Sequence, residues 1–218
     1  MKRRAFSSTL MAVAGVAALG RPAAARAQGA PVEGTHYVRL ARPLPAHAEP
    51  GKIEVIEFFW YGCPHCNAFE PTLEAWLRQQ PDDVAFQRVP VNFRDGAFIA
   101  HQRIFYALEA LGQLPAMHRK VFAAIHGDRQ RLDQSGEIAA FMAAHNVDAA
   151  RFLEAFNSFG TQARIRQANV LVVGYRIDGV PAIGVQGRFY TSGSLAGDNV
   201  RALAVADLLI QRVRKHTS

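Results

Sequence analysis

Residues 58–66 of this 218-residue chain read Phe58-Phe59-Trp60-Tyr61-Gly62-Cys63-Pro64-His65-Cys66. The apolar and aromatic run that begins at Ile53 has the length of a β-strand, and Gly62 ends it. After the cysteines, apolar residues recur at helical spacing, at Phe69, Leu73, Trp76 and Leu77. The pattern predicts a strand, a tight turn and an amphipathic helix, with both cysteines where the turn meets the helix.

The two cysteines are predicted to differ in reactivity. Pro64 suits the first position of a helix, where a missing N–H group costs nothing, so Cys63 is expected to cap the helix. At that position its sulfur faces unpaired N–H groups and the positive end of the helix dipole, which favours the thiolate, the attacking species. Cys66 lies one turn inside the helix and is expected to be the shielded, resolving thiol.

Other uses of a cysteine pair fit this spacing less well. A disulfide across two intervening residues contributes roughly 2 kcal/mol in the chain-entropy model, against roughly 4.7 kcal/mol for a 100-residue loop, so a structural role is a poor explanation. A zinc site needs four ligands, and the sequence has no second Cys/His pair at related spacing. Covalent haem attachment needs a histidine directly after the second cysteine, where Asn67 stands. Reversible redox chemistry remains, with no metal and no cofactor expected.

The first 27 residues differ in charge from the rest of the chain. They hold five of the 25 Lys and Arg residues and none of the 18 Asp and Glu residues, so without them the net charge falls from +7 to +2. That value gives no electrostatic case for nucleic-acid binding. The basic start, the apolar run 10–19 and the sequence Ala25-Arg26-Ala27 are typical of a signal peptide cleaved after Ala27. Because Arg3-Arg4 resembles a twin-arginine signal, export by that route is an alternative to general export. Both routes lead to an oxidising compartment.

The middle of the chain reads as helices. Apolar residues recur at helical spacing between Phe98 and Leu111, after Pro115, from Ile138, and after Asp148, which is predicted to cap a helix. A longer helix is predicted from Thr161 to about Tyr175, and a last one from about residue 198. Strands on both sides of a helical block suggest an inserted all-helical domain at 95–160, with 28–94 and 161–218 forming the sheet domain. His101, His118, His126 and His145 have unrelated spacings and are interpreted as surface or core residues.

The segment 58–66 resembles the active-site segment of the DsbA family of bacterial periplasmic thiol–disulfide oxidoreductases. Further segments match the family in the same order: Val91-Asn92-Phe93, Asn157-Ser158-Phe159 and Gly179-Val180-Pro181-Ala182. The resemblance implies a thioredoxin-like α/β fold, a central mixed sheet flanked by helices, with the helical insertion. DsbA proteins are the standard example of a lowered cysteine pKa and an oxidising couple, so the resemblance implies both.

His65 is expected to strengthen the oxidant. Its imidazole can donate to the Cys63 thiolate or place positive charge near it. Because a stabilised thiolate stabilises the reduced form, the disulfide then becomes easier to reduce. About 1.4 kcal/mol corresponds to one pKa unit, or to roughly 30 mV for this two-electron couple, so a modest shift separates a reductase from an oxidase.

The resemblance also implies roles for two pairs of residues away from the cysteines. It places a cis peptide bond at Val180–Pro181 against the cysteine pair, which would leave the backbone of Val180 free to pair with an extended substrate. It places an acid at Glu57 beneath the disulfide, often with a lysine on the neighbouring strand. Arg88 stands at that position here, which is a departure because arginine keeps its charge. Glu57 is expected to tune the couple or relay a proton, and an ordinary ion pair is the alternative.

The leading interpretation is a periplasmic oxidase that donates its Cys63–Cys66 disulfide to reduced, unfolded exported proteins through a mixed disulfide at Cys63. The resemblance implies reoxidation by a DsbB-type membrane protein, and the protein is expected to be a monomer. A polypeptide-binding, chaperone-like protein is an alternative from another class, which replacement of Cys63 by serine would separate. A thiol reductase is disfavoured by His65. An isomerase is disfavoured because residues 28–52 are too few for an added dimerisation domain.

Overall fold

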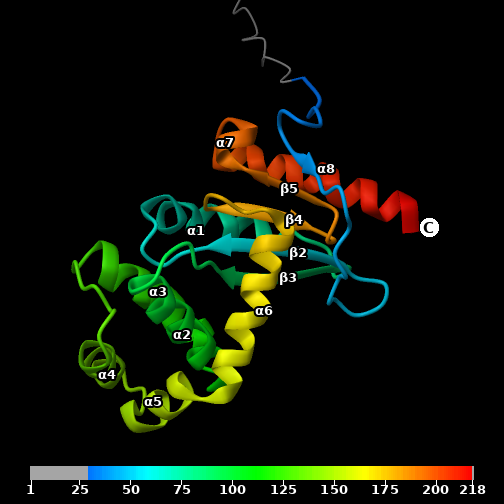
Figure 1. Ribbon diagram of the computed structural model, residues 1–218. Coiled ribbons are helices and arrows are strands. Elements are labelled where there is room, and N and C mark those ends of the chain that lie inside the picture. The colour runs from blue at the N-terminus through cyan, green and yellow to red at the C-terminus, as the bar shows by residue number, and fades with distance from the viewer. Residues whose placement is uncertain (1–28, 218) are drawn as a thin grey trace, which may run out of the picture. The chain divides into compact units, whose positions relative to one another are not determined.

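A mixed β-sheet lies at the centre of the fold in the computed structural model, which describes residues 29–217 (Figure 1). Its strands are β1 (Val38–Arg39), β2 (Ile53–Phe59), β3 (Val84–Pro90), β4 (Ala182–Val185) and β5 (Phe189–Ser192). Their spatial order is β1-β5-β4-β2-β3, with β2 and β3 parallel and the other neighbours antiparallel. β2, the strand that leads to the cysteines, is an interior strand and is buried along its whole length.

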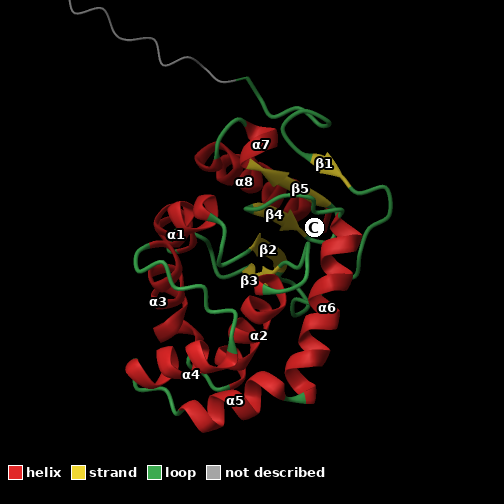
Figure 2. Ribbon diagram, turned by 60° about the vertical axis from the view of Figure 1, so that its left-hand side comes forward, coloured by secondary structure: helices red, strands yellow, loops and turns green. Residues whose placement is uncertain are grey.

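Helices cover both faces of this sheet. They are α1 (Pro64–Leu77), α2 (Ala97–Ala110), α3 (Leu114–His126), α4 (Ser135–Ala144), α5 (Ala149–Asn157), α6 (Phe159–Tyr175), α7 (Gly193–Ala196) and α8 (Asn199–Thr217). Figure 1 shows α2–α5 gathered on one side of the sheet, and Figure 2 shows α6 leading from them back to the strands. This is the predicted thioredoxin-like arrangement with helices inserted between β3 and β4.

The period-two alternation of β2 decides which side chains meet which helices. Ile53 and Val55 belong to one buried cluster with side chains of α1 and α8. Ile56 and Phe58 belong to another, which contains side chains of α2 to α6. Because this second cluster joins the sheet to the helical block, the helices share their core with the strands. The domain boundaries at 95 and 160 stay a prediction.

Most helix starts follow the sequence. The Asp148 carboxylate accepts hydrogen bonds from the N–H groups of Ala150 and Arg151 at 2.9 and 3.0 Å, so it caps α5 as predicted. α6 begins at Phe159, two residues earlier than predicted, because the Ser158 hydroxyl caps it by accepting from the Thr161 N–H. The short helix α7 was not expected from the sequence.

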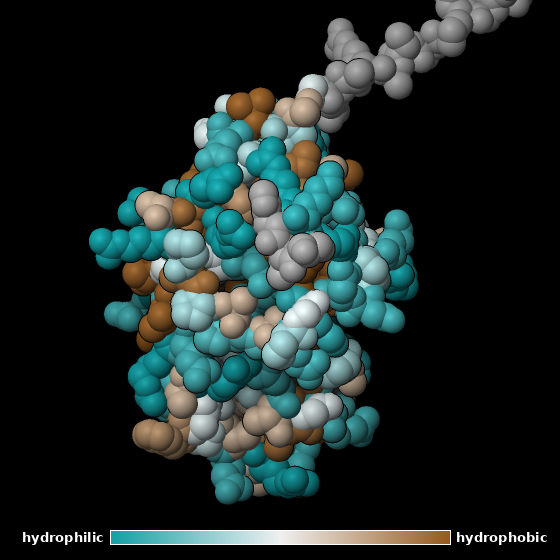
Figure 3. Space-filling view, turned by 90° about the vertical axis from the view of Figure 1, so that its right-hand side faces the viewer, coloured by the Kyte–Doolittle hydropathy of each residue, from teal (hydrophilic) through white to brown (hydrophobic). Residues whose placement is uncertain are grey.

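The surface is mixed in character. On the face shown in Figure 3 hydrophilic side chains predominate, and hydrophobic ones are scattered between them. Between residues 29 and 217 no helix is long and apolar enough to span a bilayer. In the same part of the chain, no three His, Cys, Asp or Glu side chains come together as metal ligands.

Candidate active site

Cys63 occupies the N-cap position of α1, as the sequence predicts. Its backbone is extended (φ −85°, ψ 115°), and Pro64 lies in the first turn. The N–H group of Cys66 donates to Cys63 Sγ at 3.3 Å, and the Cys63 N–H group donates to the Trp60 carbonyl at 2.9 Å. Gly62 is required in this turn, since a Cβ there would overlap the Trp60 indole. The local sequence thus directs one sulfur at the free N–H groups of the helix.

The two thiols have opposite acidities. Hydrogen bonding from the Cys66 thiol lowers the pKa of Cys63 to about 6 against the opposing effect of burial, with help from the N–H groups of Cys66 and His65 and from the charge of His65. Burial, together with Cys63 and Glu57 nearby, raises the pKa of Cys66 far above its ordinary value. Cys66 is wholly buried and Cys63 is 7% exposed, and both are free thiols in the structure. At neutral pH Cys63 is therefore a thiolate beside a protonated Cys66.

A cis-proline segment lies against the reactive sulfur. The Val180–Pro181 peptide bond is cis, as expected, and Cys63 Sγ lies 3.5 Å from the Val180 carbonyl oxygen. A hollow of about 620 Å³ opens beside this contact. Its lining includes His65, Gly179, Val180, Pro181, Tyr190 and Ser192. A polypeptide in this hollow would find the backbone of Val180 next to the sulfur.

Glu57 and Arg88 face each other across β2 and β3. They are direct partners in the parallel register, and Arg88 Nε donates to Glu57 Oε2 at 3.1 Å. Glu57 is wholly buried, whereas the Arg88 side chain is 19% exposed. Burial and the neighbouring Glu70 raise the pKa of Glu57 from its ordinary 4.5 to about 8, despite the opposing charge of Arg88. Glu57 therefore keeps a proton at neutral pH.

Glu70 and His118 also belong to this site, and the sequence analysis missed both. Arg88 Nη2 donates to Glu70 Oε2 at 3.0 Å, and His118 Nε2 lies 3.3 Å from Glu70 Oε1. Glu70 follows Cys66 by four residues, so helical periodicity alone could have placed it on the buried face of α1. His118 gave no such signal, because only the packing of α3 brings it there.

Histidines from the helical block hold the turn before the cysteines. His118 Nδ1 and the Tyr61 hydroxyl are 2.8 Å apart, and His126 Nε2 and the Tyr61 carbonyl oxygen are also 2.8 Å apart. His101 stacks on Trp60 with ring centroids 5.8 Å apart. The sequence analysis took these histidines as surface or core residues without distinguishing the two. His101 and His118 are buried, and that interpretation overlooked their contacts with the active-site turn.

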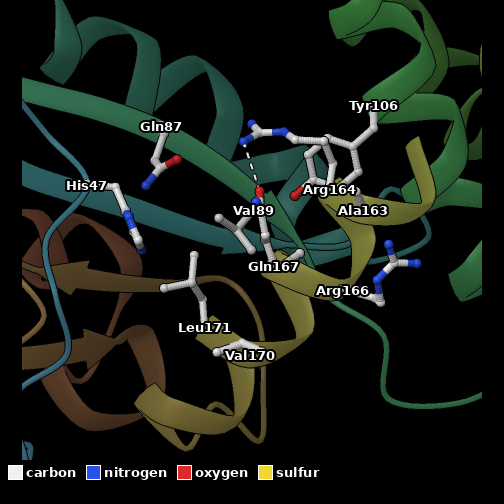
Figure 4. A pocket seen from close by; sticks show the side chains of 11 residues that line it. His47, Gln87, Val89, Tyr106, Ala163, Arg164, Arg166, Gln167, Val170 and Leu171 are labelled. Atoms are coloured by element: carbon white, nitrogen blue, oxygen red, sulfur yellow. Dashed lines mark hydrogen bonds between the residues drawn. The ribbon is translucent and has the colours of Figure 1, made fainter. Parts of the chain in front are cut away.

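A second cavity, of about 650 Å³, lies beside β3, α2 and α6 (Figure 4). Its lining combines polar and apolar side chains: His47, Gln87, Val89, Tyr106, Arg164, Arg166, Gln167, Val170 and Leu171. Arg164 forms an ion pair with Glu109 at 3.0 Å, and Arg166 lies over the ring of Phe159. Both guanidinium groups thus have partners, and no lining residue belongs to α1 or to the cis-proline segment. The redox chemistry is located at the cysteines and not here.

The fold and the site define the class of protein. A Cys-x-x-Cys pair at a helix N-terminus, with one acidic and one shielded thiol beside a cis-proline, can exchange a disulfide with another thiol pair. Comparisons with known proteins agree. The DSBA-like thioredoxin domain family matches residues 54–204. The chain therefore belongs to this family, and it is a thiol:disulfide oxidoreductase.

Relatives within the family match the chain over most of its length. It is 41% identical over 207 residues to the thiol:disulfide interchange protein DsbA of Burkholderia cepacia, covering 95% of this chain and 96% of the relative. It is 42% identical over 217 residues to DsbA of Bordetella pertussis, covering 99% and 100%. The crystal structure of Pseudomonas aeruginosa DsbA superposes with a TM-score of 0.81 at 40% identity, covering 85% of this chain and 96% of that one.

Proposed function

We propose that the protein is a periplasmic disulfide oxidase, which donates the Cys63–Cys66 disulfide to exported proteins during folding. The opposite acidities of the two thiols carry this proposal. A stable Cys63 thiolate stabilises the reduced protein, and stabilisation of the reduced form is the accepted explanation of oxidising power in DsbA proteins. Reduction of this disulfide by a substrate is therefore favourable.

The reaction proceeds in two exchanges. A substrate thiolate attacks Cys63 Sγ, the Cys63–Cys66 bond breaks, and Cys66 leaves as a thiolate that takes up a proton. A second substrate thiolate then attacks the substrate sulfur of the mixed disulfide and releases the Cys63 thiolate. Two electrons pass from the substrate to the cysteine pair, and the substrate gains one disulfide. Because Cys63 has the lower pKa, it is the better leaving group in the second exchange.

Glu57 is proposed as the proton donor for Cys66. The leaving Cys66 thiolate is strongly basic, because burial opposes its charge. Glu57 carries a proton at neutral pH and is close enough to both cysteines to affect their titration. Replacement of Glu57 by glutamine should therefore alter the dependence of exchange rates on pH between pH 4 and 8. An unchanged profile would leave Glu57 with a structural role only.

Three further residues are assigned to substrate binding and tuning. The Val180 backbone is proposed to pair with an extended substrate in the hollow beside Cys63, with Pro181 holding it there. His65 lines the same hollow, and its charge acts on Cys63, so it is proposed to tune the couple. Recognition through backbone atoms would tolerate many substrate sequences, as an oxidase of unfolded chains requires.

The compartment and the partners belong to the same proposal. The sequence of residues 1–27 supports export to the periplasm with cleavage near Ala27, a segment that lies outside the described residues. The substrates are reduced, unfolded exported proteins. Reoxidation is assigned to a DsbB-type membrane protein, and the protein is expected to act as a monomer without nucleic-acid partners.

Oxidation of a model substrate tests the function. Oxidised protein comprising residues 28–218 is mixed with reduced, denatured ribonuclease, and the loss of free thiols is followed over time. One substrate disulfide should form for each protein molecule reduced, and Cys63→Ser should abolish the reaction. Cys66→Ala should instead hold a mixed disulfide with glutathione at Cys63. If Cys63→Ser still promotes recovery of the ribonuclease, the protein acts by binding polypeptides and the oxidase proposal is wrong.

A further inference from the structure

A continuous chain of polar contacts connects α3 to β2 through α1 and β3. The Tyr61 hydroxyl contacts His118, and His118 contacts Glu70. Arg88 then donates to both carboxylates, to Glu70 through Nη2 and to Glu57 through Nε. Tyr61, Glu70 and Glu57 are wholly buried and His118 is 5% exposed. Each charge in this chain therefore needs a partner within it.

The two carboxylates share a single guanidinium group. Arg88 is within 3.1 Å of Glu57 and 3.0 Å of Glu70. Two buried carboxylates beside one cation carry an excess negative charge, so they retain one proton between them and titrate as a coupled pair. The position of that proton depends on which carboxylate has the better set of donors.

Glu70 has the better set. Its Oε2 accepts from Arg88, and its Oε1 faces His118 Nε2 at 3.3 Å. Glu70 Oε1 and His118 Nε2 are both buried, and neither makes a regular hydrogen bond among residues 29–217, so the 3.3 Å contact between them is the polar contact available to each. Glu57 Oε2 accepts from Arg88, but its Oε1 is buried without a partner. Because close donors favour the charged form of a carboxyl group, Glu57, which has fewer of them than Glu70, binds the proton more readily.

We propose that His118 is a positioning residue for disulfide exchange, which acts through Glu70 and Arg88 to place the shared proton on Glu57. The inference rests on the proposed function, because it explains why Glu57, the proposed proton donor to Cys66, carries a proton. Without His118, Glu70 and Glu57 would each depend on Arg88 alone, and the proton would move toward Glu70. Glu57 would then carry its negative charge beside the thiols.

One tautomer of His118 satisfies both of its contacts. A carboxylate only accepts hydrogen bonds, so Nε2 must carry the proton that faces Glu70. Nδ1 of the neutral ring is then an acceptor, and the Tyr61 hydroxyl donates to it at 2.8 Å. Burial raises the pKa of Tyr61 well above its ordinary value, so this hydroxyl keeps its proton. Tyr61 thereby fixes the tautomer that Glu70 requires.

The charged groups around His118 support a neutral ring. Glu70 of α1, Arg88 of β3 and Arg119 of its own helix act on it electrostatically, and its ring otherwise packs among Phe59, Phe105 and Phe122. Burial lowers the pKa of His118 against the attraction of Glu70. Burial also acts to raise the pKa of Glu70, but the close contact with His118 and the charge of Arg88 outweigh it and lower the pKa.

Carboxyl titration by ¹³C NMR tests the proposal without relying on activity. The reduced protein is labelled at the glutamate side-chain carbons, signals are assigned with Glu57→Gln and Glu70→Gln, and spectra are recorded from pH 4 to 9. In His118→Phe, proton affinity is expected to fall about tenfold or more at Glu57 and to rise at Glu70. The ability to oxidise glutathione at pH 7 should fall about threefold or more, because an ionised Glu57 opposes the Cys63 thiolate.

Matched variants separate positioning from packing. His118→Gln can donate to Glu70 and accept from Tyr61, so it should restore the wild-type titration. His145→Phe removes a partly buried histidine of the helical block that bonds only its own helix, at the Phe141 carbonyl, and should leave both carboxyls unchanged. If His118→Phe does not fold, His118→Met takes its place, since it fills the site without donating. A folded donor-free variant with unchanged Glu57 titration would overturn the proposal, even if Cys63→Ser confirms the oxidase.

Discussion

Replacement of Glu57 by glutamine is expected to make the protein progressively more stable than the wild type as the pH rises. Glutamine keeps the shape of the protonated carboxyl group and an oxygen that can accept from Arg88 Nε. It cannot ionise, so it also avoids the transfer of a negative charge into a buried position. At pH 5, where Glu57 is protonated in the folded protein, the two proteins should differ little in stability.

The size of the effect follows from the pKa of Glu57, which is 4.5 ordinarily and about 8 in the fold. Between these values the folded state binds one proton more than the unfolded state, so the free energy of unfolding falls as pH rises. The slope for one proton is about 1.4 kcal/mol per pH unit. Only the wild type has this loss, so the stability of the variant relative to the wild type should rise by about 2 to 3 kcal/mol between pH 5.5 and 7.5.

Urea unfolding of the reduced proteins, followed by tryptophan fluorescence from pH 5 to 8, measures this difference. For an m-value of roughly 2.5 kcal/mol per molar urea, the expected gain is about 1 M in the midpoint. Glu54→Gln is the matched control, because Glu54 is another buried glutamate of β2 and accepts from Gln87 and from the His47 N–H. If the difference in stability between Glu57→Gln and the wild type does not change with pH, the pKa of Glu57 is not raised.

Three further predictions concern the thiols and the frame that holds them. The rate of Cys63 alkylation should increase with pH with a midpoint near pH 6, because the thiolate is the reacting form. A midpoint above pH 8 would contradict the assigned acidity. His65→Ala should raise the pKa of Cys63, seen in thiolate absorbance, and make the couple less oxidising by about 30 mV for each tenfold change, whereas two unchanged values would leave His65 without a role. Asp148→Ala should lower the free energy of unfolding by about 1 kcal/mol through the loss of two cap hydrogen bonds, and Asp148→Asn should retain most of it.

The features that the sequence predicted correctly are set by near neighbours in the chain or by pairing along strands. The capping position of Cys63 follows from Pro64 and from the break at Gly62, and the structure confirms it. The pairing of Glu57 with Arg88 was expected from resemblance to the family, and the parallel register of β2 and β3 accounts for it. The cis bond at Val180–Pro181 depended on resemblance to the family, since the residues themselves indicated only a strand-starting proline.

The features that sequence reasoning missed depend on packing between distant segments. His118 lies 48 residues beyond Glu70 in the chain. Only the position of α3 against α1 lets its imidazole contact both Tyr61 and Glu70. The sequence did not indicate which of the four histidines are buried; His101 and His118 are, and their unrelated spacings gave no sign of their partners. The early start of α6 was missed because Ser158 was not considered as a cap.

The reduction potential of the protein comprising residues 28–218 in glutathione buffers tests whether it is a disulfide donor. Trp60 is a suitable reporter, because it lies three residues before Cys63 and stacks on Phe98 with ring centroids 4.1 Å apart. The low pKa of Cys63 predicts a potential well above that of the glutathione couple. A potential near that of thioredoxin would contradict the oxidase assignment and indicate an exported reductase that receives electrons instead of passing them on.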